Sequence, residues 1–136
     1  MVHKIKAQLR FNDIDMLGHL NNTVYFSLYD LGKARYMEEV GLRAHGPEPP
    51  ASVIADVHCS YLKPVHYGDD IFILTRCSEI GDKSFRLEQE MVDDQGEVRS
   101  RCSTVMVYID PATGMPAHVP EWYRDKINAY ELRGSE

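Results

Sequence analysis

One polar segment, residues 13–22 (Asp-Ile-Asp-Met-Leu-Gly-His-Leu-Asn-Asn), holds two carboxylates, an imidazole and two amides just before a largely apolar stretch. Either Asn21 or Asn22 can cap a helix here, because a short amide side chain accepts a hydrogen bond from the first free helical N–H groups. The start of a helix presents unpaired N–H donors and a partial positive charge. A carboxylate beside such donors supplies a base or nucleophile next to an oxyanion-stabilising site, which suits acyl transfer.

Two motifs connect this chain to a known family. From Asp15 onward the segment reads Asp-x-x-Gly-His-x-Asn-Asn-x-x-Tyr. It resembles the hotdog-fold acyl-CoA thioesterases related to 4-hydroxybenzoyl-CoA thioesterase. Residues 61–69 (Tyr-Leu-Lys-Pro-Val-His-Tyr-Gly-Asp) resemble the strand-turn-strand that precedes the longest strands in this family. The resemblance implies an enzyme that hydrolyses a thioester to a free carboxylic acid and CoA.

The resemblance places the catalytic carboxylate of the family at Asp15, whereas without the motif Asp13 and Asp15 would be ordinary turn formers. Asp15 either attacks the thioester carbonyl, giving an acyl-enzyme anhydride, or deprotonates a water. The backbone N–H at or next to Asn22 is the expected oxyanion donor, although Asn22 could equally be a helix cap alone. His19 polarises the carbonyl, orients water or bonds the loop backbone. Its His-x-Asn-Asn run resembles the branch that acts on fatty acyl chains, including plant acyl-carrier-protein thioesterases.

The residues expected to bind substrate lie at the start of the helix and near strand ends or turns. Basic side chains there would contact the phosphates of the carrier, and His58 would line the acyl pocket. Ser84 resembles a family position that lines the thioester channel from the neighbouring subunit. Each of these residues also has an ordinary surface or core role open to it. The expected set is Asn21, Tyr25, His58, Lys63, Lys83, Ser84 and Arg86, with Arg99 and Arg101 as further basic candidates.

Other groups of reactive side chains are weaker candidates for a catalytic or metal site. Three residues that alternate along one predicted strand lie side by side and cannot form the relay of a hydrolytic triad; they are Asp56, His58 and Ser60. The chain contains no Gly-x-Ser-x-Gly elbow. The three cysteines, at positions 59, 77 and 102, are far apart in the sequence, so we expect buried reduced thiols. Because no CxxC pair or dense His/Cys cluster occurs, we expect no metal site and no bound cofactor.

The elements that must position the motif follow an α+β order. A first strand is predicted at 3–11, a long helix at 22–40 closed by Gly41, and a stiff connector at 46–50. Four strands separated by turns and a short C-terminal helix follow, at 52–62, 70–80, 83–93, 97–109 and 120–132. This order predicts a hotdog fold, a five-stranded antiparallel sheet wrapped around one long central helix, as a single thioesterase domain over residues 1–136.

The long helix has one predicted buried face and a polar second half. The residues at helical spacing on that face are Tyr25, Leu28, Tyr29, Gly32 and Tyr36. Gly32 marks an expected close contact with the sheet, while residues 33–39 are expected to reach solvent.

Composition and charge limit the classes of binding partner that we expect. The net charge of −6 argues against nucleic acid, because binding phosphates needs clustered Lys and Arg. No apolar run approaches the roughly 20 residues that cross a bilayer. Residues 1–8 lack an apolar signal core, so we expect a cytoplasmic protein with no membrane partner. The expected partner is acyl-CoA as a small-molecule substrate.

Several alternatives stay open at this level. An acyl-carrier-protein thioesterase and a non-catalytic acyl-CoA binding module both fit the motif. Hotdog hydratases typically show an Asp-x-x-x-x-His spacing, whereas Asp15 and His19 are one residue closer. The family pattern implies a homodimer or homotetramer with the active site at the subunit interface, since edge pairing would cover an exposed edge strand. The length and type of the acyl group are not determined.

Overall fold

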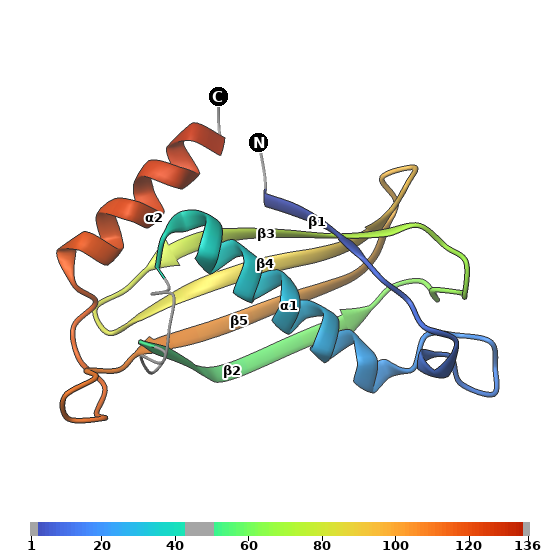
Figure 1. The fold of residues 1–136 in the computed structure, drawn as a ribbon, viewed down its shortest axis with the longest axis horizontal. Coiled ribbons are helices and arrows are strands. Elements are labelled where there is room, and N and C mark those ends of the chain that lie inside the picture. Colours follow the sequence, from blue (N-terminus) through green and yellow to red (C-terminus); the bar gives the residue numbers. More distant parts are fainter. Residues whose placement is uncertain (1–2, 43–50, 135–136) are drawn as a thin grey trace.

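The elements of the protein follow the predicted order. A computed structural model describes residues 3–42 and 51–134, so the predicted connector at 46–50 lies outside the described residues. Figure 1 shows the ribbon. The elements are β1 (His3–Ala7), a 3₁₀ turn (Phe11–Asp13), α1 (Asn22–Val40), β2 (Ser52–Tyr61), β3 (Ile71–Ile80), β4 (Ser84–Asp93), β5 (Val98–Tyr108) and α2 (Glu121–Gly134).

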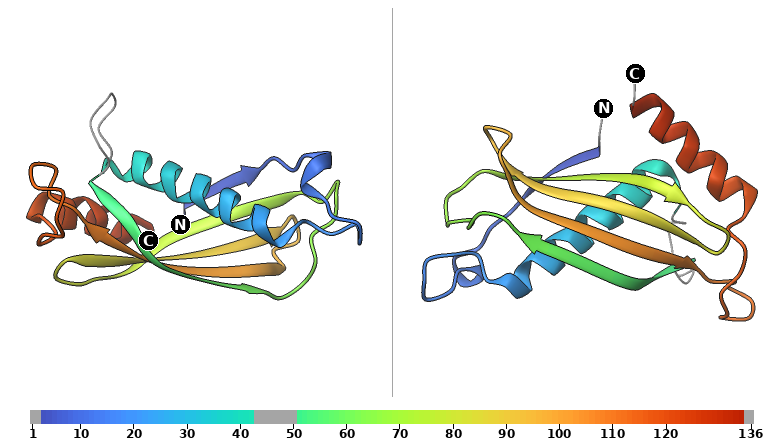
Figure 2. Two further views of the ribbon diagram at one scale, coloured as in Figure 1. Left: turned by 90° about the horizontal axis from the view of Figure 1, so that it is seen from below. Right: turned by 180° about the vertical axis from the view of Figure 1, so that it is seen from behind.

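The five strands form one antiparallel sheet in the order β1-β3-β4-β5-β2. α1 runs diagonally across one face of this sheet, and α2 lies beside the C-terminal end of α1 (Figures 1 and 2). This arrangement confirms the α+β hotdog prediction. Because β2 joins the sheet beside β5 and β1 joins beside β3, these two strands form the edges of the sheet.

The first strand is shorter than predicted. β1 ends at Ala7, whereas the strand was predicted to continue to residue 11, and Phe11 is 76% exposed. A local turn replaces the strand: the Asp13 N–H donates to the Arg10 carbonyl and the Asp13 carboxylate accepts the Arg10 N–H, both at 2.9 Å. These hydrogen bonds satisfy backbone groups that a longer strand would have used.

α1 begins and ends where the sequence predicts. The Asn21 side chain accepts the Thr23 N–H at 3.0 Å, so Asn21 is the N-cap. Gly41 follows the last turn with a φ of 91°, a left-handed conformation that favours glycine, and this confirms the C-cap.

Three residues of the predicted polar half are buried, namely Lys33, Tyr36 and Met37, and Lys33 is the charged one among them. Lys33 is only 5% exposed, because it lies on the side of α1 that faces β5. Its ammonium lies 3.2 Å from the Asp30 carboxylate and donates to the Thr104 hydroxyl at 3.4 Å. A buried ammonium needs such partners to offset its loss of hydration. The prediction that Lys33 is exposed was therefore wrong.

The expected close contact at Gly32 is confirmed. A Cβ atom on Gly32 would lie 2.8 Å from the Gln89 side-chain nitrogen and 2.8 Å from a methyl carbon of Ile73. Gln89 is buried in β4 and donates to the Tyr29 carbonyl of α1 and to the Thr75 hydroxyl, both at 3.0 Å. The helix therefore lies against the sheet at a distance that only glycine permits.

The three cysteines are free thiols: Cys102 is buried, whereas Cys59 and Cys77 are half-buried. Burial raises the pKa of the Cys77 thiol to about 12, so this thiol stays protonated at neutral pH. Within residues 3–42 and 51–134, no helix is long and apolar enough to cross a membrane.

We predict that Gly32→Ala destabilises the protein by about 1–3 kcal/mol, because overpacking moves Gln89 or Ile73. A loss of stability is informative here, because without the close contact this substitution should stabilise the helix. Alanine is favoured over glycine in a helix interior by about 1 kcal/mol. Urea unfolding followed by circular dichroism measures the difference. Ser27→Ala at an exposed position of the same helix is the control and should be neutral or stabilising. A Gly32→Ala protein as stable as wild type would contradict the close contact.

Candidate active site

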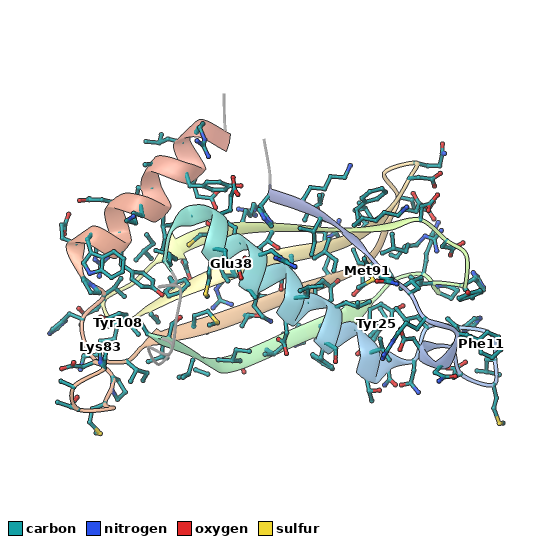
Figure 3. All side chains as sticks on the ribbon, viewed as in Figure 1. Phe11, Tyr25, Glu38, Lys83, Met91 and Tyr108 are labelled. Atoms are coloured by element: carbon teal, nitrogen blue, oxygen red, sulfur yellow. The ribbon has the colours of Figure 1, made fainter. Side chains whose placement is uncertain are left out.

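A cavity of about 340 Å³ opens at the N-terminal end of α1. It lies at the end of the molecule where Tyr25 and Phe11 are labelled in Figure 3. Residues from the polar loop, the first turn of α1 and the end of β2 line it: Asp15, His19, Leu20, Asn22, Tyr25, Tyr61, Leu62, Lys63 and Pro64. The cavity therefore combines the reactive loop with the start of a helix.

Among the described residues that line this cavity, Asp15 is the only carboxylate, and hydrogen bonds of its own turn hold it. One carboxylate oxygen, Oδ1, accepts the N–H groups of Leu17 at 2.9 Å and His19 at 3.2 Å. The Asp15 N–H donates to the His19 carbonyl at 2.8 Å, and Gly18 has a φ of 81°. Within the described parts of the chain, Oδ2 accepts no hydrogen bond. One oxygen thus orients the carboxylate and leaves the other available for chemistry.

The first turn of α1 supplies a donor beside this carboxylate. Asn21 caps the helix, and the backbone N–H of Asn22 has no acceptor among the residues that the structure describes. The Tyr61 hydroxyl donates to the Asn22 carbonyl at 3.2 Å, and the rings of Tyr61 and Tyr25 meet edge to face at 4.8 Å. Both rings line the cavity, one from α1 and one from the end of β2. An unpaired N–H at a helix start is the kind of donor that stabilises an oxyanion.

The loop after Asp15 is paired with the segment that follows β2. The Leu20 N–H donates to the Val65 carbonyl at 2.6 Å, and His19 and His66 form an isolated antiparallel bridge. Their imidazole rings meet edge to face with centroids 5.2 Å apart. The position of His19 therefore depends on residues more than 40 positions away in the sequence.

The structure gathers most of the predicted loop residues into one site. Asp15, His19, Asn22, Tyr25 and Lys63 all line the cavity, and Asn21 lies next to them as the helix cap. The Lys63 ammonium lies 3.0 Å from the Glu97 carboxylate at an exposed position.

The remaining predicted residues lie elsewhere in this chain. Lys83 lies at the opposite end of the molecule from Tyr25 (Figure 3). Ser84 and Arg86 follow it in β4. His58 pairs with Ser103 in β5, whereas the neighbouring Thr104 bonds to α1. Because successive side chains alternate across a strand, His58 faces away from α1. A single chain therefore does not bring these four residues to Asp15.

Four residues that line the cavity were not predicted as site residues: Leu20, Tyr61, Leu62 and Pro64. Tyr61 carried a usable signal, because it opens the second motif and lies near the end of the strand predicted at 52–62, on the same face as Cys59. Nothing in the sequence indicates that its hydroxyl reaches the first turn of α1.

A larger cleft of about 480 Å³ lies between the end of β3 and α2. Glu79 and Glu131 line it, and Glu131 accepts hydrogen bonds from the Tyr36 hydroxyl and the Cys77 N–H, so it joins α2 to α1 and the sheet. The Glu131 carboxylate is thus engaged in holding the fold together, whereas Asp15 Oδ2 accepts no hydrogen bond from the described residues. The smaller cavity is the better candidate for chemistry. Within the described residues, no three His, Cys, Asp or Glu side chains group closely enough to hold a metal ion.

Two carboxylates near the site are ionised more readily than usual. The Glu97 N–H and the Arg99 guanidinium hold the pKa of Asp93 below its ordinary value. Burial opposes ionisation of Asp69, yet hydrogen bonds from the His66 N–H and Arg99 lower its pKa as well. A carboxyl whose pKa is lower in the folded state stabilises the fold above its unfolded-state pKa.

We predict that the free energy of unfolding falls as the pH drops through the unfolded-state pKa of Asp, about 3.9. Asp93→Asn should flatten this fall, because the amide oxygen can still accept the N–H groups of Gln95 and Glu97 but carries no charge to lose. Urea unfolding from about pH 6 to about pH 3 measures both slopes. Asp70→Asn, whose side chain is 56% exposed, is the control. Equal slopes in wild type and Asp93→Asn would contradict the assignment.

The fold and this cavity define the class of protein. An antiparallel sheet wrapped across one long helix is the hotdog fold. Residues 9–127 match the family described as the Thioesterase-like superfamily. The chain belongs to this superfamily and is a thioester hydrolase.

Solved structures agree with this assignment. A thioesterase from Thermus thermophilus, complexed with coenzyme A and Zn, is 33% identical. The match covers 96% of this chain and 95% of that one, with a TM-score of 0.84. A thioesterase-superfamily structure from Jannaschia sp. CCS1 is 28% identical over 91% of this chain and 79% of that one, with a TM-score of 0.81.

A 4-hydroxybenzoyl-CoA thioesterase variant complexed with 4-hydroxybenzoyl-CoA shares the fold, with a TM-score of 0.81. It is 18% identical, and the match covers 91% of this chain and 96% of that one. These structures confirm the resemblance that the two motifs indicated.

Proposed function

We propose that this protein is an acyl-CoA thioesterase in which Asp15 is the catalytic carboxylate and the Asn22 backbone N–H is the oxyanion donor. The observation that carries the proposal is their position: both residues line one cavity, and the hydrogen bonds of the turn orient Asp15. The coenzyme A bound by the Thermus thermophilus thioesterase supports CoA as the carrier. The net charge of −6 also favours CoA over an acidic carrier protein.

The thioester carbonyl would bind with its oxygen toward the start of α1. As the carbonyl carbon is attacked, negative charge develops on this oxygen, where the Asn22 N–H and the helix dipole stabilise it. Asp15 Oδ2 either attacks the carbon itself, giving an anhydride that water later cleaves, or removes a proton from the attacking water. In both routes the C–S bond breaks, the CoA thiolate leaves, and water supplies the new oxygen of the acid. The route draws on side chains, backbone and water alone.

Two further residues that line the cavity would contribute: His19 to the reaction and Lys63 to binding of the carrier. His19 lies between the Asp15 turn and His66, where its ring can orient water or the carbonyl. The Lys63 ammonium is 57% exposed at the rim, which is a suitable place to meet a phosphate of the carrier.

We predict that Asp15→Asn lowers kcat for thioester hydrolysis at least about a hundredfold, because the amide neither attacks the carbonyl nor removes a proton. The measurement follows free CoA from a panel of thioesters, benzoyl- through long-chain acyl-CoA, with the three protein thiols blocked.

Asp13→Asn is the matched control, because Asp13 is the other acid of the pair and does not line the cavity. Its carboxylate accepts the Arg10 N–H, and an amide oxygen can do the same. Activity should survive in this control. If Asp15→Asn turned over thioesters as fast as wild type, the assignment of Asp15 would be wrong. A wild-type protein that binds acyl-CoA without turnover would favour the binding module.

We also propose that two copies pair through β2. This edge strand exposes Val53 and Ile54, each 45% exposed, next to backbone groups that a second strand can bond. Antiparallel pairing of two β2 strands brings the start of one against the end of the other, which carries Tyr61. Val53 and Ser84 both pair with Val107, so Ser84 lies near the start of β2. The dimer would thereby bring Ser84 and its neighbours toward the cavity of the other copy.

We predict a particle of twice the 15.6 kDa chain mass, or a multiple of that, in light scattering coupled to size-exclusion chromatography. The double substitution Val53→Lys and Ile54→Lys should yield monomers, because lysines on an edge strand oppose strand pairing. Leu132→Lys changes another exposed apolar residue, which lies on α2, and should leave the mass unchanged. A monomeric wild-type protein would contradict the proposed pairing.

A further inference from the structure

Arg99 is a nearly buried arginine behind the candidate site. Its side chain is 15% exposed. The guanidinium donates to the Asp93 carboxylate at 3.0 Å, to the Asp69 carboxylate at 3.2 Å and to the Pro64 carbonyl at 2.7 Å. Arg99 does not line the cavity. These contacts leave the guanidinium committed to protein acceptors, so it is not available to bind a phosphate.

The contacts of Arg99 fix the segment between β2 and β3 at both ends. At the beginning, the Arg99 carbonyl accepts the N–H groups of Leu62 at 2.9 Å and Lys63 at 3.1 Å. At the end, the Asp69 carboxylate that Arg99 holds also accepts the His66 N–H at 2.8 Å. On the other side, Asp93 anchors the guanidinium to the turn between β4 and β5.

This segment in turn holds the loop that carries Asp15. The Leu20 N–H donates to the Val65 carbonyl at 2.6 Å, and the His19 and His66 rings are in contact. Leu20 lies between the Asp15 turn and the start of α1. Consequently, the position of Asp15 relative to the Asn22 N–H depends on a segment that Arg99 fixes.

We propose that Arg99 is a positioning residue for the catalytic turn. It acts through Pro64 and Asp69 on the segment that pairs with Leu20, and thus sets the placement of the Asp15 carboxylate. The inference rests on the proposed function for its effect on catalysis, whereas its effect on the loop does not depend on any activity. A misplacement of about 1 Å can cost about a hundredfold in rate.

The kinetic test compares Arg99→Gln with Arg35→Gln. Arg35 lies on α1, its guanidinium is 3.5 Å from the Glu38 carboxylate, and its side chain is 58% exposed. We expect kcat to fall about ten- to a hundredfold in Arg99→Gln, with a smaller change in KM. Arg35→Gln should retain wild-type kinetics. Circular dichroism confirms that both variants are folded at the assay temperature.

A double-mutant cycle separates positioning from general stability. Asp69→Asn removes the partner on the loop side, so it should lower kcat as Arg99→Gln does, and the double variant should lose little more. Kinetic losses that multiply in the double variant would overturn the proposal. Equal losses in Arg99→Gln and Arg35→Gln would overturn it as well.

Hydrogen exchange of the Leu20 amide tests the loop independently of catalysis. In ¹⁵N-labelled protein, this amide should exchange at least about tenfold faster in Arg99→Gln than in wild type or Arg35→Gln, because its acceptor segment loosens. Unchanged exchange would overturn the proposal. If exchange accelerates while even wild type hydrolyses no thioester, the proposed function fails but the positioning role stands.

Discussion

The close packing of α1 on the sheet at Gly32 is the contact from which the geometry of the molecule follows. Gln89 of β4 lies beneath Gly32 and donates to the Tyr29 carbonyl, so helix and sheet are joined by contact and by hydrogen bonding. This contact sets the height of the helix above the sheet. Because a helix is rigid, it also sets where the first turn of α1 meets the end of β2, which is where the candidate site forms (Figure 1).

The candidate site combines local and distant interactions with different physical roles. The turn at Asp15 and the cap at Asn21 use hydrogen bonds between residues at most four apart, which preorganise a carboxylate and a helix start. These local hydrogen bonds do not by themselves fix where the turn and the helix start lie relative to each other and to the sheet. Alignment comes from the paired segment after β2 and from Arg99, which joins that segment to two other parts of the chain. Preorganised donors need this second layer of support.

The predicted site residues are divided between the two ends of the molecule, and this division bears on how two copies would pair. The end near Tyr25 contains the cavity, and the end near Lys83 contains several residues that the family resemblance assigns to substrate binding (Figure 3). A single chain keeps these groups apart. The free edge of β2 runs between the two ends, so two-fold pairing along it would place unlike ends together. The same geometry would cover an exposed strand and complete two sites.

Local sequence patterns were sufficient to predict the element order, both ends of α1, the need for glycine at position 32 and the composition of the Asp15 turn. These features depend on neighbouring residues, on helical or strand periodicity and on the conformational limits of side chains. The burial of Lys33, the orientation of His58 away from α1 and the hydrogen bond from Arg99 to the segment after β2 became visible only in the folded chain. These outcomes depend on which strand lies beneath which helix face and on contacts between distant segments, and sequence periodicity carries no information about either.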